Sequence, residues 1–150
     1  MGLRYMFDKI LYPTDFSDVA NKAMDYITKL KEAGGKEVIV LHVIDERAIG
    51  DICLLYASRG SVEMVRRIEE EAWKEMNNIG ARLREEGFKV KLRVERGVPL
   101  NEILRVEQDE AVSVTVIGSH GKSNVKEMLL GSVSEKFIRK SGTPVLVVKR

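Results

Sequence analysis

The chain of 150 residues is poor in cysteine, histidine and proline. Its single cysteine, Cys53, excludes an internal disulfide framework and the common four-cysteine zinc sites. The two histidines, His42 and His120, lie far apart in the sequence, and we therefore expect no metal site built from His and Cys side chains. No apolar stretch approaches the roughly 20 residues of a membrane-spanning helix, and the N-terminus lacks the apolar segment of a secretory signal. These absences predict a cytoplasmic protein without a membrane anchor.

A large excess of charge of one sign is also missing, because 25 Lys and Arg residues face 23 Asp and Glu residues. General nucleic-acid binders carry a marked basic excess, and this balance argues against that class. Apolar residues make up 44% of the chain, which is too many for a disordered segment. The length fits one domain, predicted to span residues 1–150.

The apolar residues alternate between short runs and long amphipathic segments. Short runs rich in β-branched residues, bounded by Gly, Pro, Asp or Asn, predict strands at 9–12, 37–43, 89–94, 112–118 and 144–148. Apolar residues spaced by three and four predict helices at 20–30, 65–83, 100–106 and 133–138. Residues 45–60 fit neither period, and we expect an irregular excursion there. The alternating order predicts an α/β fold, a doubly wound five-stranded parallel sheet with helices on both faces.

Local capping signals mark the ends of the first two helices. Ser17 is placed to cap the N-terminus of the first helix. Gly34-Gly35 and Gly87 follow the first and second helices, where a residue with positive φ is common.

The topology itself predicts where a ligand would bind. Right-handed crossovers on both faces require the winding to reverse once, and five strands usually adopt the order 3-2-1-4-5 or 2-1-3-4-5. In the first order, strands one and four are neighbours whose carboxyl ends separate to form a crevice. Pro13, Thr14 and Asp15 follow strand one, and Gly118 ends strand four, so these residues would open onto it.

A glycine-rich segment, 118–134, leaves strand four and enters the last helix. Glycine lets the backbone approach a ligand closely. Ser132, Val133 and Ser134 begin a helix, so their N–H groups lack acceptors in that helix and can cradle a phosphate. The segment is not a Walker A motif, because that motif would need glycine at Val116. From the glycines alone, a connection that binds no ligand remains an equal alternative.

The spacing G-x2-G-x9-G-[ST], formed by Gly118, Gly121, Gly131 and Ser132, resembles the nucleotide-binding signature of the universal stress protein family. The likeness covers nearly the whole chain: KILYPTDFS near the start, VIVLHVID in strand two, GVP at 97–99 and GTPVLVVKR at the end. The ATP-binding archaeal members are the most similar. The resemblance implies the strand order 3-2-1-4-5, an adenine nucleotide alpha hydrolase-like fold, and bound ATP, ADP or AMP.

The resemblance also implies roles for individual residues. Pro13, Thr14, Asp15 and Val43 would line the adenine and ribose region, Gly118 and Gly121 would approach the ribose and phosphates, and Gly131, Ser132, Val133 and Ser134 would hold the phosphate chain. Mg²⁺ or Mn²⁺ would be held mainly by the phosphates and water. From the residues alone, Asp15 could instead cap the turn after Pro13.

The resemblance further implies a homodimer that pairs through the terminal strand, 145–148. We interpret the protein as a nucleotide-dependent regulatory switch that acts on an unknown downstream protein. The alternative is a slow ATPase assisted by a partner. No motif supplies an arginine, a Walker B acid or a base for phosphoryl transfer, and this argues against an efficient enzyme. A phospho-acceptor receiver domain, which needs clustered acidic residues, and a nucleotide-free interaction module are less favoured.

Overall fold

The computed structural model describes residues 6–55, 59–120 and 130–150. In these residues the strands are β1 (Lys9–Pro13), β2 (Glu37–Asp45), β3 (Lys89–Gly97), β4 (Val114–Gly118) and β5 (Val145–Val148). The helices are α1 (Asp18–Leu30), α2 (Glu46–Leu55), α3 (Arg59–Glu85), α4 (Pro99–Asp109) and α5 (Ser132–Lys140).

The strands form one parallel sheet in the order β3-β2-β1-β4-β5, which confirms one of the two predicted orders. β1 pairs with β2 along its whole length, from Lys9 opposite Glu37 to Pro13 opposite Leu41. It pairs with β4 only at Ile10 and Leu11, although β1 runs on to Pro13 and β4 to Gly118. The carboxyl ends of these two strands therefore separate, as the crevice requires.

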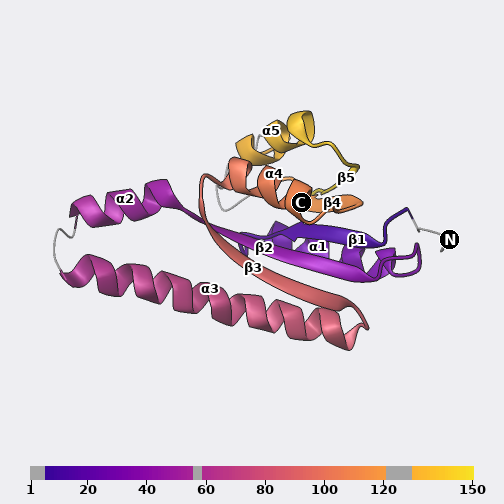
Figure 1. Ribbon diagram of the computed structural model, residues 1–150, viewed down its shortest axis with the longest axis horizontal. Helices are drawn as coiled ribbons and strands as arrows, with labels where there is room; N and C mark the ends of the chain where they lie inside the picture. Colours follow the sequence, from indigo (N-terminus) through magenta and orange to yellow (C-terminus); the bar gives the residue numbers. More distant parts are fainter. Residues whose placement is uncertain (1–5, 56–58, 121–129) are drawn as a thin grey trace.

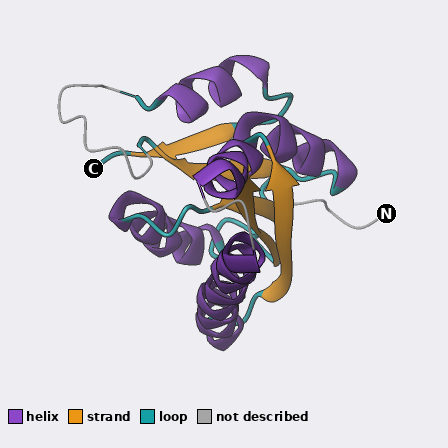
Figure 2. Cartoon of the chain, turned by 90° about the vertical axis from the view of Figure 1, so that its left-hand side faces the viewer, coloured by secondary structure: helices purple, strands orange, loops and turns teal. Residues whose placement is uncertain are grey.

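Helices cover both faces of the sheet (Figure 2). On one face, α1 and α3 bury residues such as Ile27 and Met76 against β1, β2 and β4. On the other face, α4 and α5 bury Ile103 and Phe137 against the same three strands. Tyr12 lies in the first core, where its hydroxyl donates to the Ala20 carbonyl, and burial raises the pKa of Tyr12 to about 12. This bond ties the end of β1 to the first turn of α1, beside the crevice.

The predicted caps of α1 and α3 are confirmed. The Ser17 side chain accepts a hydrogen bond from the Ala20 N–H. Gly34 and Gly87 have φ of 101° and 91°, which L side chains rarely adopt. After Gly87, the Phe88 N–H returns to the Leu83 carbonyl, the bond that closes a Schellman motif.

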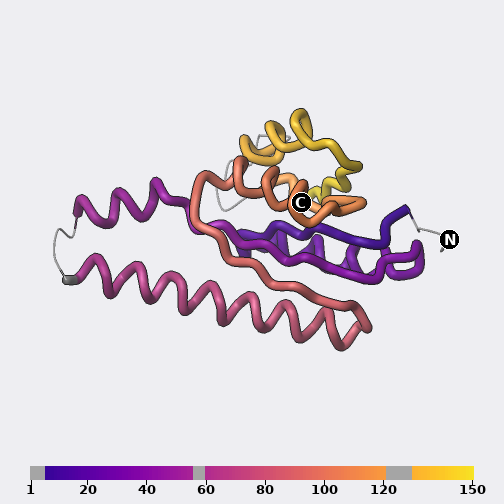
Figure 3. Tube along the Cα trace, in the orientation of Figure 1, coloured from indigo at the N-terminus to yellow at the C-terminus, as the bar shows by residue number. Residues whose placement is uncertain are grey.

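The expectation of an irregular excursion at 45–60 is wrong. α2 occupies Glu46–Leu55, and α3 begins at Arg59, before the predicted start of that helix. α2 and the amino-terminal part of α3 project beyond the sheet, at the left of Figures 1 and 3. None of the α2 residues is fully buried, and Leu54 is 82% exposed, so the apolar residues of this helix do not mark a face that faces the core. The local signal was Asp45, whose carboxylate accepts the Arg47 N–H at the helix start.

A buried carboxylate holds the connection between α5 and β5. Glu107 of α4 is 4% exposed and accepts hydrogen bonds from the Ser141 hydroxyl at 2.6 Å, the Gly142 N–H at 3.0 Å and the Thr143 hydroxyl at 3.1 Å. The three donors belong to consecutive residues, so one side chain orders the whole turn that leads into the terminal strand.

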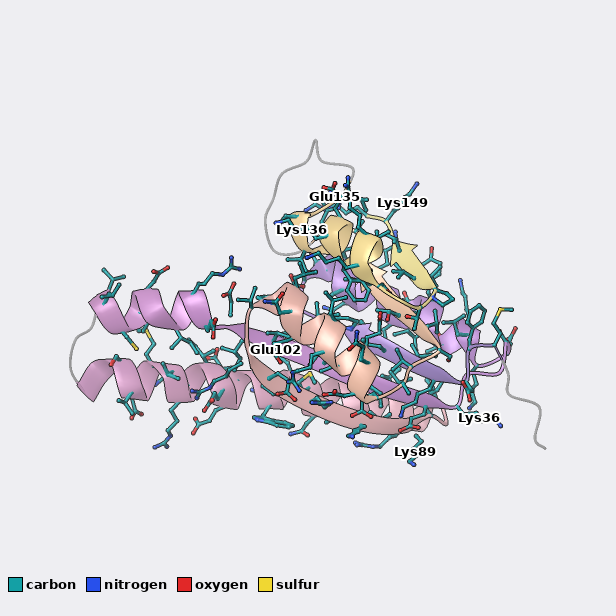
Figure 4. The ribbon with its side chains drawn as sticks, turned by 45° about the horizontal axis from the view of Figure 1, so that its top comes forward. Lys36, Lys89, Glu102, Glu135, Lys136 and Lys149 are labelled. Atoms are coloured by element: carbon teal, nitrogen blue, oxygen red, sulfur yellow. The ribbon has the colours of Figure 1, made fainter. Side chains whose placement is uncertain are left out.

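The two edges of the sheet differ in chemistry. Along β3, Lys91 and Arg93 both pair with Glu110, at 2.6 and 3.1 Å. Burial opposes ionisation of Glu110, but hydrogen bonds and charge from these cations still hold its pKa below the usual range. Lys36 and Lys89 lie at the amino ends of β2 and β3, at the lower right of Figure 4. β5, by contrast, reads Val-Leu-Val-Val.

No helix among the described residues is both long and apolar enough to cross a membrane.

Candidate functional site

A pocket of about 220 Å³ opens where the carboxyl ends of β1 and β4 separate, beside the start of α5. Nine of the ten predicted site residues line it: Pro13, Thr14, Asp15, Val43, Gly118, Gly131, Ser132, Val133 and Ser134. The tenth, Gly121, lies outside the described residues. Segments more than 100 residues apart in the sequence thus meet at one place, and side chains do not fill the mouth of β1.

One wall is the turn that links β1 to α1. The Thr14 hydroxyl accepts the Phe16 N–H at 3.0 Å, and the Asp15 carboxylate accepts the Ser17 N–H at 3.0 Å. Phe16 has φ of 64° between them. Asp15 therefore makes the turn contact considered as its alternative role, and it also lines the pocket. The two roles are compatible, because a carboxylate has two oxygens and this bond uses one of them.

The opposite wall is the junction between β4 and α5. The Gly131 N–H donates to the Ser119 carbonyl at 2.6 Å, and the buried Ser134 hydroxyl donates to the Gly118 carbonyl at 2.8 Å. These bonds hold the N-terminus of α5 against the end of β4. Gly131 is the N-cap and makes no side-chain capping bond. Ser132, Val133 and Ser134 occupy the first turn, where amides have no acceptor in their own helix.

The remaining lining residues were not predicted from the sequence. They are Ala20, Leu41, Pro99, Ile103, Ile117 and His120. Pro99 and Ile103 lie four residues apart in the first turns of α4 and hence on one helix face. That spacing was visible in the sequence, but only the packing of α4 beside Leu41 and Ile117 brings this face to the pocket.

His120 also lines the pocket, and its Nδ1 is 2.8 Å from the Ser119 hydroxyl oxygen. This contact fixes the direction of the ring at the point where β4 gives way to the glycine-rich segment. No group of three or more His, Cys, Asp or Glu side chains suited to a metal ion occurs among residues 6–55, 59–120 and 130–150.

The pocket combines an apolar chamber with helix amides at one end. Such a chamber suits a flat, weakly polar ring system, and the positive end of the α5 dipole suits an anion. Phosphate groups are bound in this way at many helix N-termini. The geometry thus fits a ligand with a planar part and a phosphate part.

Comparison with known proteins agrees with the family resemblance found in the sequence. A family model described as the universal stress protein family matches residues 6–149. The chain is 46% identical over 156 residues to Universal stress protein MJ0577 of Methanocaldococcus jannaschii, covering 97% of this chain and 96% of that protein. It superimposes on the solved structure of MJ0577 with a TM-score of 0.89 and 47% identity, over 97% of both chains.

Two more distant solved structures share the fold. A universal stress protein in complex with cAMP matches with a TM-score of 0.65 and 21% identity, covering 95% of this chain and 97% of that one. The universal stress protein of Archaeoglobus fulgidus in complex with dAMP matches with a TM-score of 0.63 and 18% identity, covering 97% of this chain and all of that one.

Proposed function

The chain belongs to the universal stress protein family, and on that premise we propose that it binds ATP, or another adenine nucleotide, as a nucleotide-dependent regulatory switch. The observation that carries the proposal is the meeting of the apolar chamber with the N-terminal amides of α5 in one pocket. We take residues 1–150 as one universal stress protein domain and place it in the cytoplasm, in keeping with its single cysteine.

In this proposal the base and ribose lie against the β1 and β2 side of the pocket, near Thr14, Asp15 and Val43. The phosphates lie at the first turn of α5, where amide N–H groups and the Ser132 hydroxyl can donate to them. The cAMP and dAMP complexes support an adenine nucleotide as the class of ligand, because both ligands join adenosine-type groups to one phosphate.

Mg²⁺ or Mn²⁺ would accompany the nucleotide. Mg²⁺ keeps several waters and commonly binds substrate phosphates rather than a full set of protein ligands. We therefore assign the metal mainly to the phosphate oxygens. Asp15 is the acidic side chain among the described residues that line the pocket, and it can accept hydrogen bonds from water on such an ion.

Replacing Ser132 by alanine should weaken ATP binding about 10- to 100-fold, because one charge-assisted hydrogen bond is worth about 1.5–3 kcal/mol. Ser132 is exposed, so the change should leave the folded protein intact. Isothermal titration with ATP, ADP and AMP measures the effect. Ser132→Thr keeps the hydroxyl and is the matched control. Equal affinities for the wild type and the alanine variant would remove Ser132 from the phosphate site.

Incubation with labelled ATP separates a switch from an enzyme. The described lining of the pocket contains no arginine, the group that often stabilises the charge of the transferring phosphoryl group. We expect phosphate release far below about one per second, the low end of ordinary enzyme turnover. Release at that rate or faster from purified protein would favour the ATPase alternative instead.

We also propose that the protein forms a homodimer through β5 (Val145–Val148), with the nucleotide state changing this surface or that of an unknown protein partner. β5 is an edge strand, and edge strands carry unpaired N–H and C=O groups that can pair with another chain. Its apolar sequence and the exposed Leu146 support this edge over the charged β3 edge.

A further inference from the structure

His42 of β2 lies next to the pocket without lining it. Its neighbours Leu41 and Val43 both line the pocket. Because successive side chains of a strand point to opposite faces, His42 points to the other face. There its Nδ1 is 2.8 Å from the Thr14 carbonyl oxygen, and its ring stacks on Phe16 with 4.3 Å between centroids and 25° between planes.

The two contacts fall on the same turn, the one that carries Thr14 and Asp15 into the pocket. A positive φ of 64° at Phe16 is uncommon for a bulky residue and persists only where the surroundings hold it. Two hydrogen bonds within the turn, to the Phe16 and Ser17 amides, close it locally. Strand β2 also holds the turn, because the Leu41 carbonyl accepts the Thr14 N–H at 2.8 Å. His42 of the same strand contacts the turn both at the Thr14 carbonyl and at Phe16, the residue with positive φ.

We propose that His42 is a positioning residue for the nucleotide site. It donates from Nδ1 to the Thr14 carbonyl and supports the Phe16 ring, and so it fixes the direction in which Thr14 and Asp15 face the ligand. It does not touch the ligand itself. This inference rests on the proposed function, because it assigns the turn to nucleotide binding.

The two contacts can be removed separately. His42→Asn places an amide nitrogen close to the position of Nδ1 and keeps the hydrogen bond, but it removes the ring. His42→Phe keeps the ring over Phe16 and removes the donor. Each variant is titrated with ATP and with AMP, and its thermal unfolding is measured without nucleotide.

We expect His42→Phe to bind both nucleotides about tenfold more weakly, because it loses one hydrogen bond that orients the turn. His42→Asn should recover most of that affinity. The loss should be equal for ATP and AMP, because the turn faces the part of the ligand that the two share. Reduced stability in both variants with unchanged affinity would show a purely structural histidine and overturn the proposal.

Amide hydrogen exchange in the nucleotide-free protein tests the same turn without a ligand. In His42→Phe, the Phe16 and Ser17 amides should exchange faster than in the wild type, whereas His42→Asn should protect them nearly as well. Unchanged protection of both amides in His42→Phe would overturn the inference whatever the nucleotide affinities. Wild-type protein that binds no adenine nucleotide would instead reject the proposed function, and the exchange rates would still decide whether His42 holds the turn.

Discussion

Replacing Gly131 by tryptophan should abolish nucleotide binding and leave the protein folded. Gly131 is the N-cap of α5, with φ of −69° and ψ of 158°, an extended conformation that any residue adopts. The substitution therefore introduces bulk without backbone strain. Gly131 lines the pocket at the proposed phosphate position, and an indole ring there would occupy the space beside the first-turn amides. Isothermal titration with ATP, together with thermal unfolding, measures both parts of the expectation.

Gly131→Ser is the matched control. Serine is a favoured N-cap residue and adds only a small side chain. Binding within a few-fold of the wild type, with equal or higher stability, is expected from this variant. A folded Gly131→Trp protein with wild-type affinity would mean that the phosphates do not lie at the N-terminus of α5.

The sheet could be predicted because its buried strands are short runs of apolar residues in the sequence. β1 and β4 are short apolar runs between turn residues, and their neighbours show a helical period. The choice between two strand orders needed the family resemblance, because right-handed crossovers permit both. α2 was not found from its period, because its apolar residues do not mark one buried face: Ile49 and Ile52 are half-buried, whereas Leu54 and Leu55 are exposed.

The part of the candidate site that lies along one backbone segment could be predicted from the sequence. The part that depends on packing between distant residues could not. The spacing of glycines and serine along one segment identifies Gly118, Gly131 and Ser132 as site residues. Ile103 reaches the pocket only because α4 packs across β2 beside Leu41, a contact between residues far apart in the chain. The Ser134 hydroxyl shows a second limit: the sequence places Ser134 near the phosphate, but only the structure shows that its hydroxyl donates to the Gly118 carbonyl. Its backbone N–H is therefore the group that we assign to the phosphate.

The second large effect is expected at the terminal strand, β5, where the backbone groups of alternate residues face either β4 or the open edge of the sheet. The carbonyls of Pro144 and Val148 accept hydrogen bonds from the Thr115 and Ser119 N–H groups, on the β4 side. The backbone N–H and C=O groups of successive strand residues point to alternate sides. Since those of the even-numbered residues 144 and 148 face β4, those of the odd-numbered residues between them point away from β4. Val147 is such a residue, and its N–H faces the open edge of the sheet.

Val147→Pro should therefore convert a wild-type dimer to a monomer and leave the β4–β5 ladder in place. Proline removes the outward N–H, and it is tolerated on edge strands because no ladder bond inside the sheet is lost. Val147→Thr, which keeps the N–H and the β-branched shape, should remain dimeric. Sedimentation velocity gives the mass of each form, and thermal unfolding shows whether the proline variant is folded. A folded Val147→Pro protein that sediments as a dimer would place the contact between subunits on another surface, because pairing along this edge depends on that N–H.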